Sequence, residues 1–262
     1  DGDIDLVTGA IQDRRMQVFL NSGQARYGAR TLYQTGQRPF MVEVGELTGD
    51  EYPEIASANE TAGTVTVYLN NGDGTGRFGG RRDYRVGRLP VGLAMGDFDG
   101  DGSEDVVSAN RGSRDFSVLM NQGNGVLRAA VNYTVDGTPW YVVTADFDAD
   151  GRWDLAVGQN GQEVAIFHGI GGAPGLRVRV VGTGLNPEAV GASVRIAYDS
   201  GWGPLREIQA GSGYWSKNGA VQVFGLREPA QGLRVRWPDG SEETYDVRPN
   251  TREIVVRPGE GR

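Results

Sequence analysis

The sequence predicts an all-β protein: a partial β-propeller of four-stranded calcium-binding blades, followed by a small C-terminal β domain. An acidic, glycine-containing loop recurs about every 50 residues, since 51 residues separate Glu46 from Asp97 and 49 separate Asp97 from Asp146. Short apolar runs of strand length flank each loop. Four short strands in a repeat of about fifty residues are typical of a propeller blade.

Each repeat contains four candidate strands in the same order. The first follows a proline that stands seven residues before the loop, at Pro39, Pro90 and Pro139. The second begins where a loop ends, at Asp5, Glu54, Asp105 and Asp154. The third ends at Asn21, Asn70, Asn121 and Gly169, and the fourth is marked by Tyr33, Tyr84 and Tyr133. We therefore assign residues 1–170 to blades, with two complete repeats, the end of an earlier one, and a last one without its fourth strand. Because the chain opens inside an acidic loop, we expect further blades upstream.

The loops read DFDGDGSED from Asp97 and DFDADGRWD from Asp146. Hard oxygen donors that converge on a tight loop suit Ca²⁺, and glycine at position six permits a turn with positive φ. The predicted ligands of the two sites are Asp97, Asp99, Asp101, Ser103 (by its backbone carbonyl) and Asp105, and Asp146, Asp148, Asp150, Arg152 and Asp154. A third copy offers Glu46, Asp50 and Glu54, but has Thr48 and Glu51 in place of an aspartate and the glycine, so we expect a weaker site. An EF-hand would need a glutamate at position twelve, where Ser108 and Val157 stand.

These loops and strands resemble FG-GAP/VCBS repeats, the calcium-binding blades of integrin α-subunits and many bacterial secreted proteins. The resemblance implies a propeller that binds calcium. It covers roughly residues 1–170.

After the glycine-rich stretch 169–175, residues 176–258 alternate in the β manner. Four segments resemble the ASPIC/UnbV family: NPEAVGASV from Asn186, REIQAGSGYWSKN from Arg206, VFGL from Val223 and VRWPDG from Val235. This family commonly follows VCBS repeats. The densest polar cluster, which includes Arg206, Glu207, Ser212 and Tyr214, is either a glycine-bearing turn or a small recognition surface for a glycan or protein. WPDG from Trp237 predicts a hairpin turn.

Charge and composition exclude several functions. The net charge is −8, with 14 basic and 24 acidic residues in 1–174 against 12 and 10 beyond, which argues against a nucleic-acid partner. The chain has no cysteine and no apolar run long enough to span a membrane. The single histidine, His168, occupies a strand end, and we expect no catalytic residue.

The expected function is non-catalytic: extracellular, cell-surface or periplasmic binding of a protein or glycan, with Ca²⁺ stabilising the blades. Two alternatives remain open at this point. One is a calcium-dependent enzyme acting on polysaccharides, and the other is a purely structural module of a larger surface protein.

Overall fold

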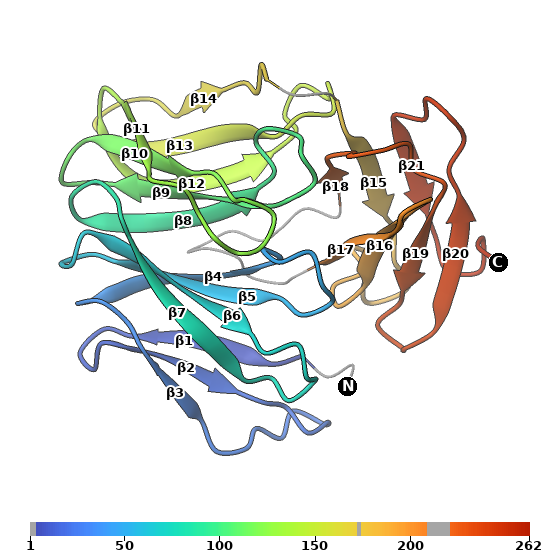
Figure 1. The fold of residues 1–262 in the computed structure, drawn as a ribbon, viewed down its shortest axis with the longest axis horizontal. Helices are drawn as coiled ribbons and strands as arrows, with labels where there is room; N and C mark the ends of the chain where they lie inside the picture. The colour runs from blue at the N-terminus through green and yellow to red at the C-terminus, as the bar shows by residue number, and fades with distance from the viewer. Residues whose placement is uncertain (1–3, 172–173, 209–220) are drawn as a thin grey trace.

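The computed structural model describes residues 4–171, 174–208 and 221–262. Within these ranges every helix or strand assigned is a β-strand, which confirms the all-β class. Strands β1 to β14 form four sheets, here called blades 1 to 4, and β15 to β21 form two C-terminal sheets (Figure 1). In the described part of the chain, no helix has the length and hydropathy that crossing a membrane requires.

All four blades are antiparallel and follow the chain order. Blade 1 contains β1 (Leu6–Ala10), β2 (Arg15–Phe19) and β3 (Thr31–Gln34). Blade 2 contains β4 (Pro39–Gly45), β5 (Glu54–Asn59), β6 (Thr64–Asn70) and β7 (Phe78–Arg85). Blade 3 contains β8 (Pro90–Gly96), β9 (Asp105–Asn110), β10 (Asp115–Leu119) and β11 (Val131–Thr134). Blade 4 contains β12 (Thr138–Ala145), β13 (Asp154–Asn160) and β14 (Ala165–Phe167). The predicted strand order within the repeat is therefore confirmed.

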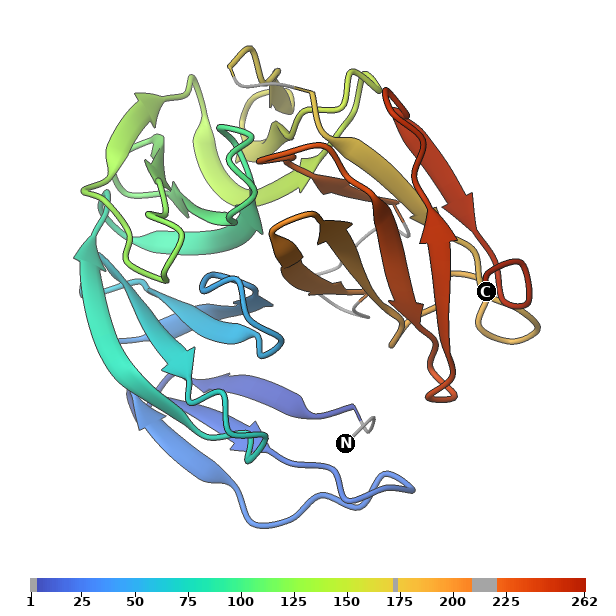
Figure 2. The ribbon, with the colours of Figure 1, turned by 45° about the vertical axis from the view of Figure 1, so that its right-hand side comes forward.

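The blades stack in a fan, and apolar clusters fill the spaces between neighbours (Figure 2). Strands β5 and β9 are buried along their whole lengths because each has a blade on both faces. In contrast, β14 at the end of the fan exposes Ile166 and Phe167. Burial of both faces explains why the central repeats read as near-continuous apolar runs instead of strict alternation.

The recurring prolines and tyrosines have structural causes. Pro39 and Pro90 open the first strands of their blades, and Pro139 is the second residue of β12. Each stands at a register shift, where a residue without an N–H is tolerated. Tyrosines tie successive blades together: the Tyr33 hydroxyl accepts a hydrogen bond from Phe78 N at 3.2 Å, and the Tyr84 hydroxyl accepts one from Leu127 N at 3.1 Å.

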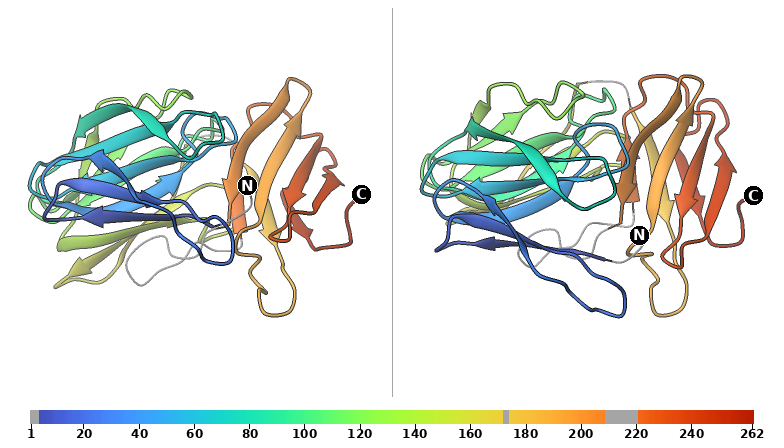
Figure 3. Two further views of the ribbon diagram at one scale, coloured as in Figure 1. Left: turned by 90° about the horizontal axis from the view of Figure 1, so that it is seen from below. Right: turned by 60° about the horizontal axis from the view of Figure 1, so that its bottom comes forward.

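The C-terminal sheets pack face to face around their own apolar core, beside the blades (Figure 3). One sheet contains β18 (Val221–Phe224), β15 (Leu176–Val180) and β21 (Glu253–Val256), and its β15–β21 pair is parallel. The other contains β17 (Gly201–Glu207), β16 (Ser193–Tyr198), β19 (Gly232–Arg236) and β20 (Glu242–Asp246).

The predicted hairpin turn after β19 is confirmed, because the backbone N–H of Trp237 donates to Ser241 O at 2.8 Å. The Trp237 side chain packs into the core and is 3% exposed.

Candidate metal centre

The loop from Asp97 to Asp105 is wrapped around a buried carboxylate. Asp97 is 2% exposed, and its two oxygens accept backbone N–H groups of Gly100, Asp101 and Gly102 at 2.8 to 3.1 Å. Gly100 and Gly102 have φ of 76° and 94°, which confirms the left-handed turn predicted at position six and adds one at position four. The chain therefore bends so that Asp97, Asp99 and Asp101 present oxygens that all lie within 4.8 Å of one another.

The carboxylate at position nine ties three strands together. Asp105 Oδ2 accepts from Phe98 N at 2.9 Å, and Oδ1 accepts from Asn121 N at 2.7 Å. Asp105 lies outside the group formed by the other three aspartates, although it was predicted as a ligand of the same site. Ser103 N bonds to Asp101 Oδ1 at 2.8 Å, while the predicted role of the Ser103 carbonyl stays a prediction.

The loop of blade 4 repeats this geometry. Asp146, Asp148 and Asp150 form a group of the same kind, and Asp146 accepts from the N–H groups of Asp150 and Gly151 at 3.0 Å. Arg152 bonds through its backbone N–H to Asp150 Oδ1 at 2.8 Å, and its guanidinium pairs with Asp150 Oδ2 at 2.6 Å.

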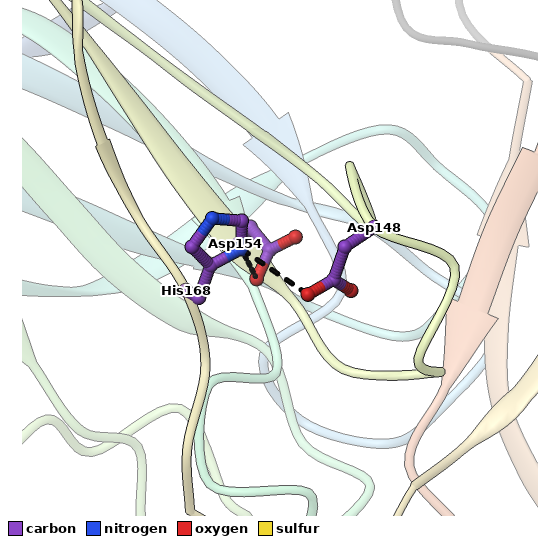
Figure 4. A group of neighbouring side chains, drawn as sticks. All are labelled: Asp148, Asp154 and His168. Carbon is purple, nitrogen blue, oxygen red and sulfur yellow. Dashed lines mark ion pairs between the residues drawn. The ribbon is translucent and has the colours of Figure 1, made fainter.

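The position-nine residue of blade 4, Asp154, accepts from Phe147 N and Gly169 N at 2.8 and 2.9 Å. Asp154 also belongs to a second group, with Asp148 and His168 (Figure 4).

The third copy of the loop is built differently. Glu46, Asp50 and Glu54 are the residues that approach one another there. Glu46 Oε1 takes the wrapping role by accepting from Thr48 N and Gly49 N at 2.9 and 2.8 Å. Its other oxygen, Oε2, is buried without a hydrogen-bond partner among the described residues.

The buried acids of the loop at Asp97 and of the loop at Glu46 suit a cation. Burial raises the pKa of Asp97 to about 6 and that of Asp105 to about 8. Burial and the neighbouring Glu54 raise the pKa of Glu46 to about 9. A carboxylate removed from water binds its proton more tightly, whereas a bound cation favours the ionised form. The donor sets of the three loops consist of oxygen alone, which fits Ca²⁺.

The C-terminal sheets pack directly on the loops of blades 3 and 4. Arg177 Nε on β15 lies 3.0 Å from Asp146 Oδ2. Gly225, just after β18, lies so close to Asp97 that a Cβ there would be 1.8 Å from Asp97 Oδ2. The backbone adds a bond from Gly175 N to Gly151 O at 2.7 Å. The acidic loops and the joint between the two parts of the chain thus share one surface.

Arg206 belongs to this joint and not to an exposed recognition surface. It is 3% exposed, its guanidinium lies over the rings of Trp153 and Phe224 at 5.5 and 4.9 Å, and its Nε is 3.5 Å from Glu104 Oε1. The structure therefore places Arg206 in the interface, and its predicted binding role stays a prediction. Ser212 and Tyr214, from the same predicted cluster, lie outside the described residues.

Glu207 has a different environment from Arg206. It lines a cleft of about 650 Å³ between blades 1 and 2 and the C-terminal sheets. Burial and the nearby charge of Asp5 raise the pKa of Glu207. The lining of the cleft also includes charged residues, Glu43 and Arg236, and aromatic residues, Tyr52 and Trp237.

Sequence reasoning missed His168, Glu104 and Asn121 as parts of this region. Asn121 recurs in the repeat with Asn21 and Asn70, so its period carried a signal. His168 directly follows β14, and the next residue, Gly169, donates its backbone N–H to Asp154, the position-nine aspartate. Glu104 has no counterpart in the other loops, because Pro53 and Trp153 stand there.

Comparison with known proteins agrees with this architecture. Residues 46–108 and 97–157 match the FG-GAP-like repeat, and residues 182–262 match the family described as ASPIC and UnbV. Cartilage acidic protein 1 of Mus musculus is 34% identical over 119 residues, and that of Homo sapiens is 36% identical over 119 residues. Both matches cover 44% of this chain, which spans only 18% of the length of either relative.

Among solved structures, the biofilm matrix protein Bap1 of V. cholerae matches with a TM-score of 0.43 at 13% identity, covering 95% of this chain and 47% of that one. A functionally unknown protein from Desulfotomaculum acetoxidans has a TM-score of 0.41 at 12% identity, covering 94% of this chain and 72% of that one. Both family matches lie where the sequence shows its resemblances, and together they include most of the chain. The chain therefore carries FG-GAP-like repeats, followed by a segment that matches the ASPIC and UnbV family.

Proposed function

We propose that this chain is a non-catalytic binding module in which Ca²⁺ stabilises the blades. The loops of blades 3 and 4 carry the proposal, because each presents three aspartates on a turn that backbone N–H groups already hold in shape. When bound, calcium would supply the positive charge that offsets the repulsion among these carboxylates. Asp97, Asp99 and Asp101 would hold one ion, and Asp146, Asp148 and Asp150 another.

The first test is calorimetric titration of the chain with Ca²⁺, paired with thermal unfolding in calcium and in chelator. We expect at least two sites. A ligand at one hundred times its Kd stabilises the native state by about 2.7 kcal/mol, so calcium should raise the melting temperature. Asp99→Asn should remove one site and lower the melting temperature in calcium, while leaving it unchanged in chelator.

Asp136→Asn is the matched control, since Asp136 is an exposed aspartate outside the loops. It should titrate and melt like the parent chain in both conditions. Equal losses for Asp99→Asn in calcium and in chelator would mean that this side chain stabilises the fold without metal. Absence of binding heat in the parent chain would overturn the proposal.

The proposed ligand is a protein segment or glycan in the extracellular or periplasmic space, as expected from the repeat families. The cleft beside Glu207 supports this, because Tyr52 offers a ring surface and Arg236 offers hydrogen-bond donors. A glycan panel screened in calcium and in chelator tests it. Binding that Tyr52→Ala weakens more than Trp202→Ala, an exposed residue outside the cleft, would favour the cleft.

Enzymatic turnover of a polysaccharide on the same panel would contradict the non-catalytic proposal. Calcium-dependent stability without binding to any glycan or protein would favour a purely structural module.

A further inference from the structure

His168 lies at the loop of blade 4 and directs one ring nitrogen toward two aspartates (Figure 4). Its Nδ1 is 3.3 Å from Asp148 Oδ2 and 3.5 Å from Asp154 Oδ1. The three side chains come from three places: the β12–β13 loop, the first residue of β13, and the residue just after β14. One atom from each lies within 4.8 Å of the other two.

Backbone hydrogen bonds hold the three donors in position. Asp154 is 1% exposed, and its Oδ1 accepts from Gly169 N at 2.9 Å, so the residue next to His168 is fixed to the aspartate that His168 faces. Asp148 Oδ1 accepts from Asp150 N at 3.1 Å, which leaves Oδ2 turned toward the imidazole. The His168 side chain is 53% exposed, so solvent reaches the ring.

The spacing fits a small metal ion. Ligands about 2.0–2.1 Å from a tetrahedral zinc lie about 3.3–3.4 Å apart. The distances from Nδ1 to the two aspartate oxygens, 3.3 and 3.5 Å, fall close to this value. Imidazole nitrogen suits zinc and other first-row transition metals, whereas calcium takes oxygen ligands.

Blade 4 alone among the repeated blades has this nitrogen. The position of His168 in the repeat is occupied by Met120 in blade 3 and by Leu69 in blade 2. The acidic groups of blades 2 and 3 therefore contain oxygen donors only.

We propose that Asp148, Asp154 and His168 form a site for a first-row divalent transition metal, with zinc as the representative ion. Because Asp148 also belongs to the acidic group with Asp146 and Asp150, the loop of blade 4 differs in metal preference from the loop of blade 3. This inference does not depend on calcium binding at Asp97.

The test uses the chain without a polyhistidine tag and follows zinc binding by competition with a chromophoric chelator and by nitrogen-15 NMR. His168 is the only histidine of the sequence, so the imidazole signals belong to one residue. We expect one zinc ion to bind in calcium-free buffer and to shift the Nδ1 resonance. His168→Met, which installs the residue of blade 3, should weaken zinc binding at least tenfold.

Asp136→Asn serves as the control, because Asp136 is exposed and lies outside the acidic loops, and it should leave zinc binding unchanged. Zinc binding of equal strength in His168→Met, or no zinc-dependent shift of Nδ1, would overturn the site. In that case His168 makes a direct ion pair with the two aspartates. Calcium titration of the same samples reports separately on the loop at Asp97, so failure of the two proposals can be told apart.

Discussion

A single buried acid on the first strand of blade 2 shows how burial controls charge in this fold. Glu43 lies on β4, is 6% exposed, and also lines the cleft beside Glu207. Burial, together with the charge of Glu104, raises the pKa of Glu43 from 4.5 to about 8. Near neutral pH the folded chain therefore keeps Glu43 protonated, whereas the unfolded chain has already released this proton.

This shift predicts a pH-dependent effect of Glu43→Gln. When the pKa of an acid is higher in the folded state, the folded state binds the proton more tightly. Its contribution to stability is fully present below the pKa of the unfolded chain, and it is lost as pH rises through the pKa of the folded chain. Between pH 4.5 and about 8 the parent chain should lose up to about 1.4 kcal/mol per pH unit from this group. Glu43→Gln should therefore match the parent near pH 4 and exceed it in stability at pH 8.5, by urea unfolding.

Glu163→Gln is the control, because Glu163 is exposed and should give the parent profile. The same difference between Glu43→Gln and the parent at both pH values would show that the carboxyl keeps its ordinary pKa.

At the scale of elements, one asparagine joins a strand end to two loops. Asn121 is 2% exposed, and its Nδ2 donates to Glu104 O within its own blade and to Leu47 O of blade 2, at 2.9 and 2.8 Å. The equivalent Asn70 donates only within its own blade among the bonds described, to Pro53 O at 3.3 Å. Asn121 thus braces two neighbouring blades.

Asn121→Ala should destabilise the chain by about 1–3 kcal/mol, because the Glu104 carbonyl loses this buried donor, whereas Leu47 O keeps the bond from Gly125 N at 2.7 Å. Urea unfolding measures the loss. Asn70→Ala is the matched substitution in the repeat and should cost about 1 kcal/mol or less. Equal losses for the two variants would show that the bond across the blades adds nothing.

Much of the strand pattern could be predicted from sequence, but some of its elements could not. The repeat placed the strands of each blade because proline, acidic loop and tyrosine recur at fixed offsets. Two edge strands were not predicted from the sequence. Strand β17 contains two glycines and a proline, which are unfavourable in strands, and β20 is mostly polar because one of its sides faces solvent. The aspartates of the loops were predictable from spacing, whereas His168 was not, since its approach to Asp148 depends on how β14 ends.

At the scale of the whole molecule, the joint between blades and C-terminal sheets depends on a buried charge pair. Glu104 Oε1 faces Arg206 Nε at 3.5 Å, and Glu104 Oε2 accepts from Glu46 N at 2.9 Å. Trp153 Nε1 donates to Val223 O at 3.1 Å across the same joint. Sequence alone could not predict these contacts, because they join residues of two families with separate patterns.

Arg206→Met should destabilise the chain by about 3–5 kcal/mol, because it leaves a buried carboxylate without its partner. Adding Glu104→Gln should recover part of the loss, and urea unfolding of the two single variants and the double variant measures the coupling. Arg227→Met is the control, since Arg227 also lies over a ring, that of Tyr198 at 4.9 Å, but is exposed. Strict additivity of the two losses would contradict a coupled pair.

The contacts of Arg177 and Gly175 also determine how the molecule responds to tension. The linker after blade 4 is bridged by the bond from Gly175 N to Gly151 O and by the pair of Arg177 with Asp146. A force applied between the first blade and residue 262 must break this hydrogen bond and this ion pair before the linker can extend. Stiffer acidic loops would therefore raise the force at which the C-terminal sheets separate from the fan, so the joint would act as a mechanical clamp.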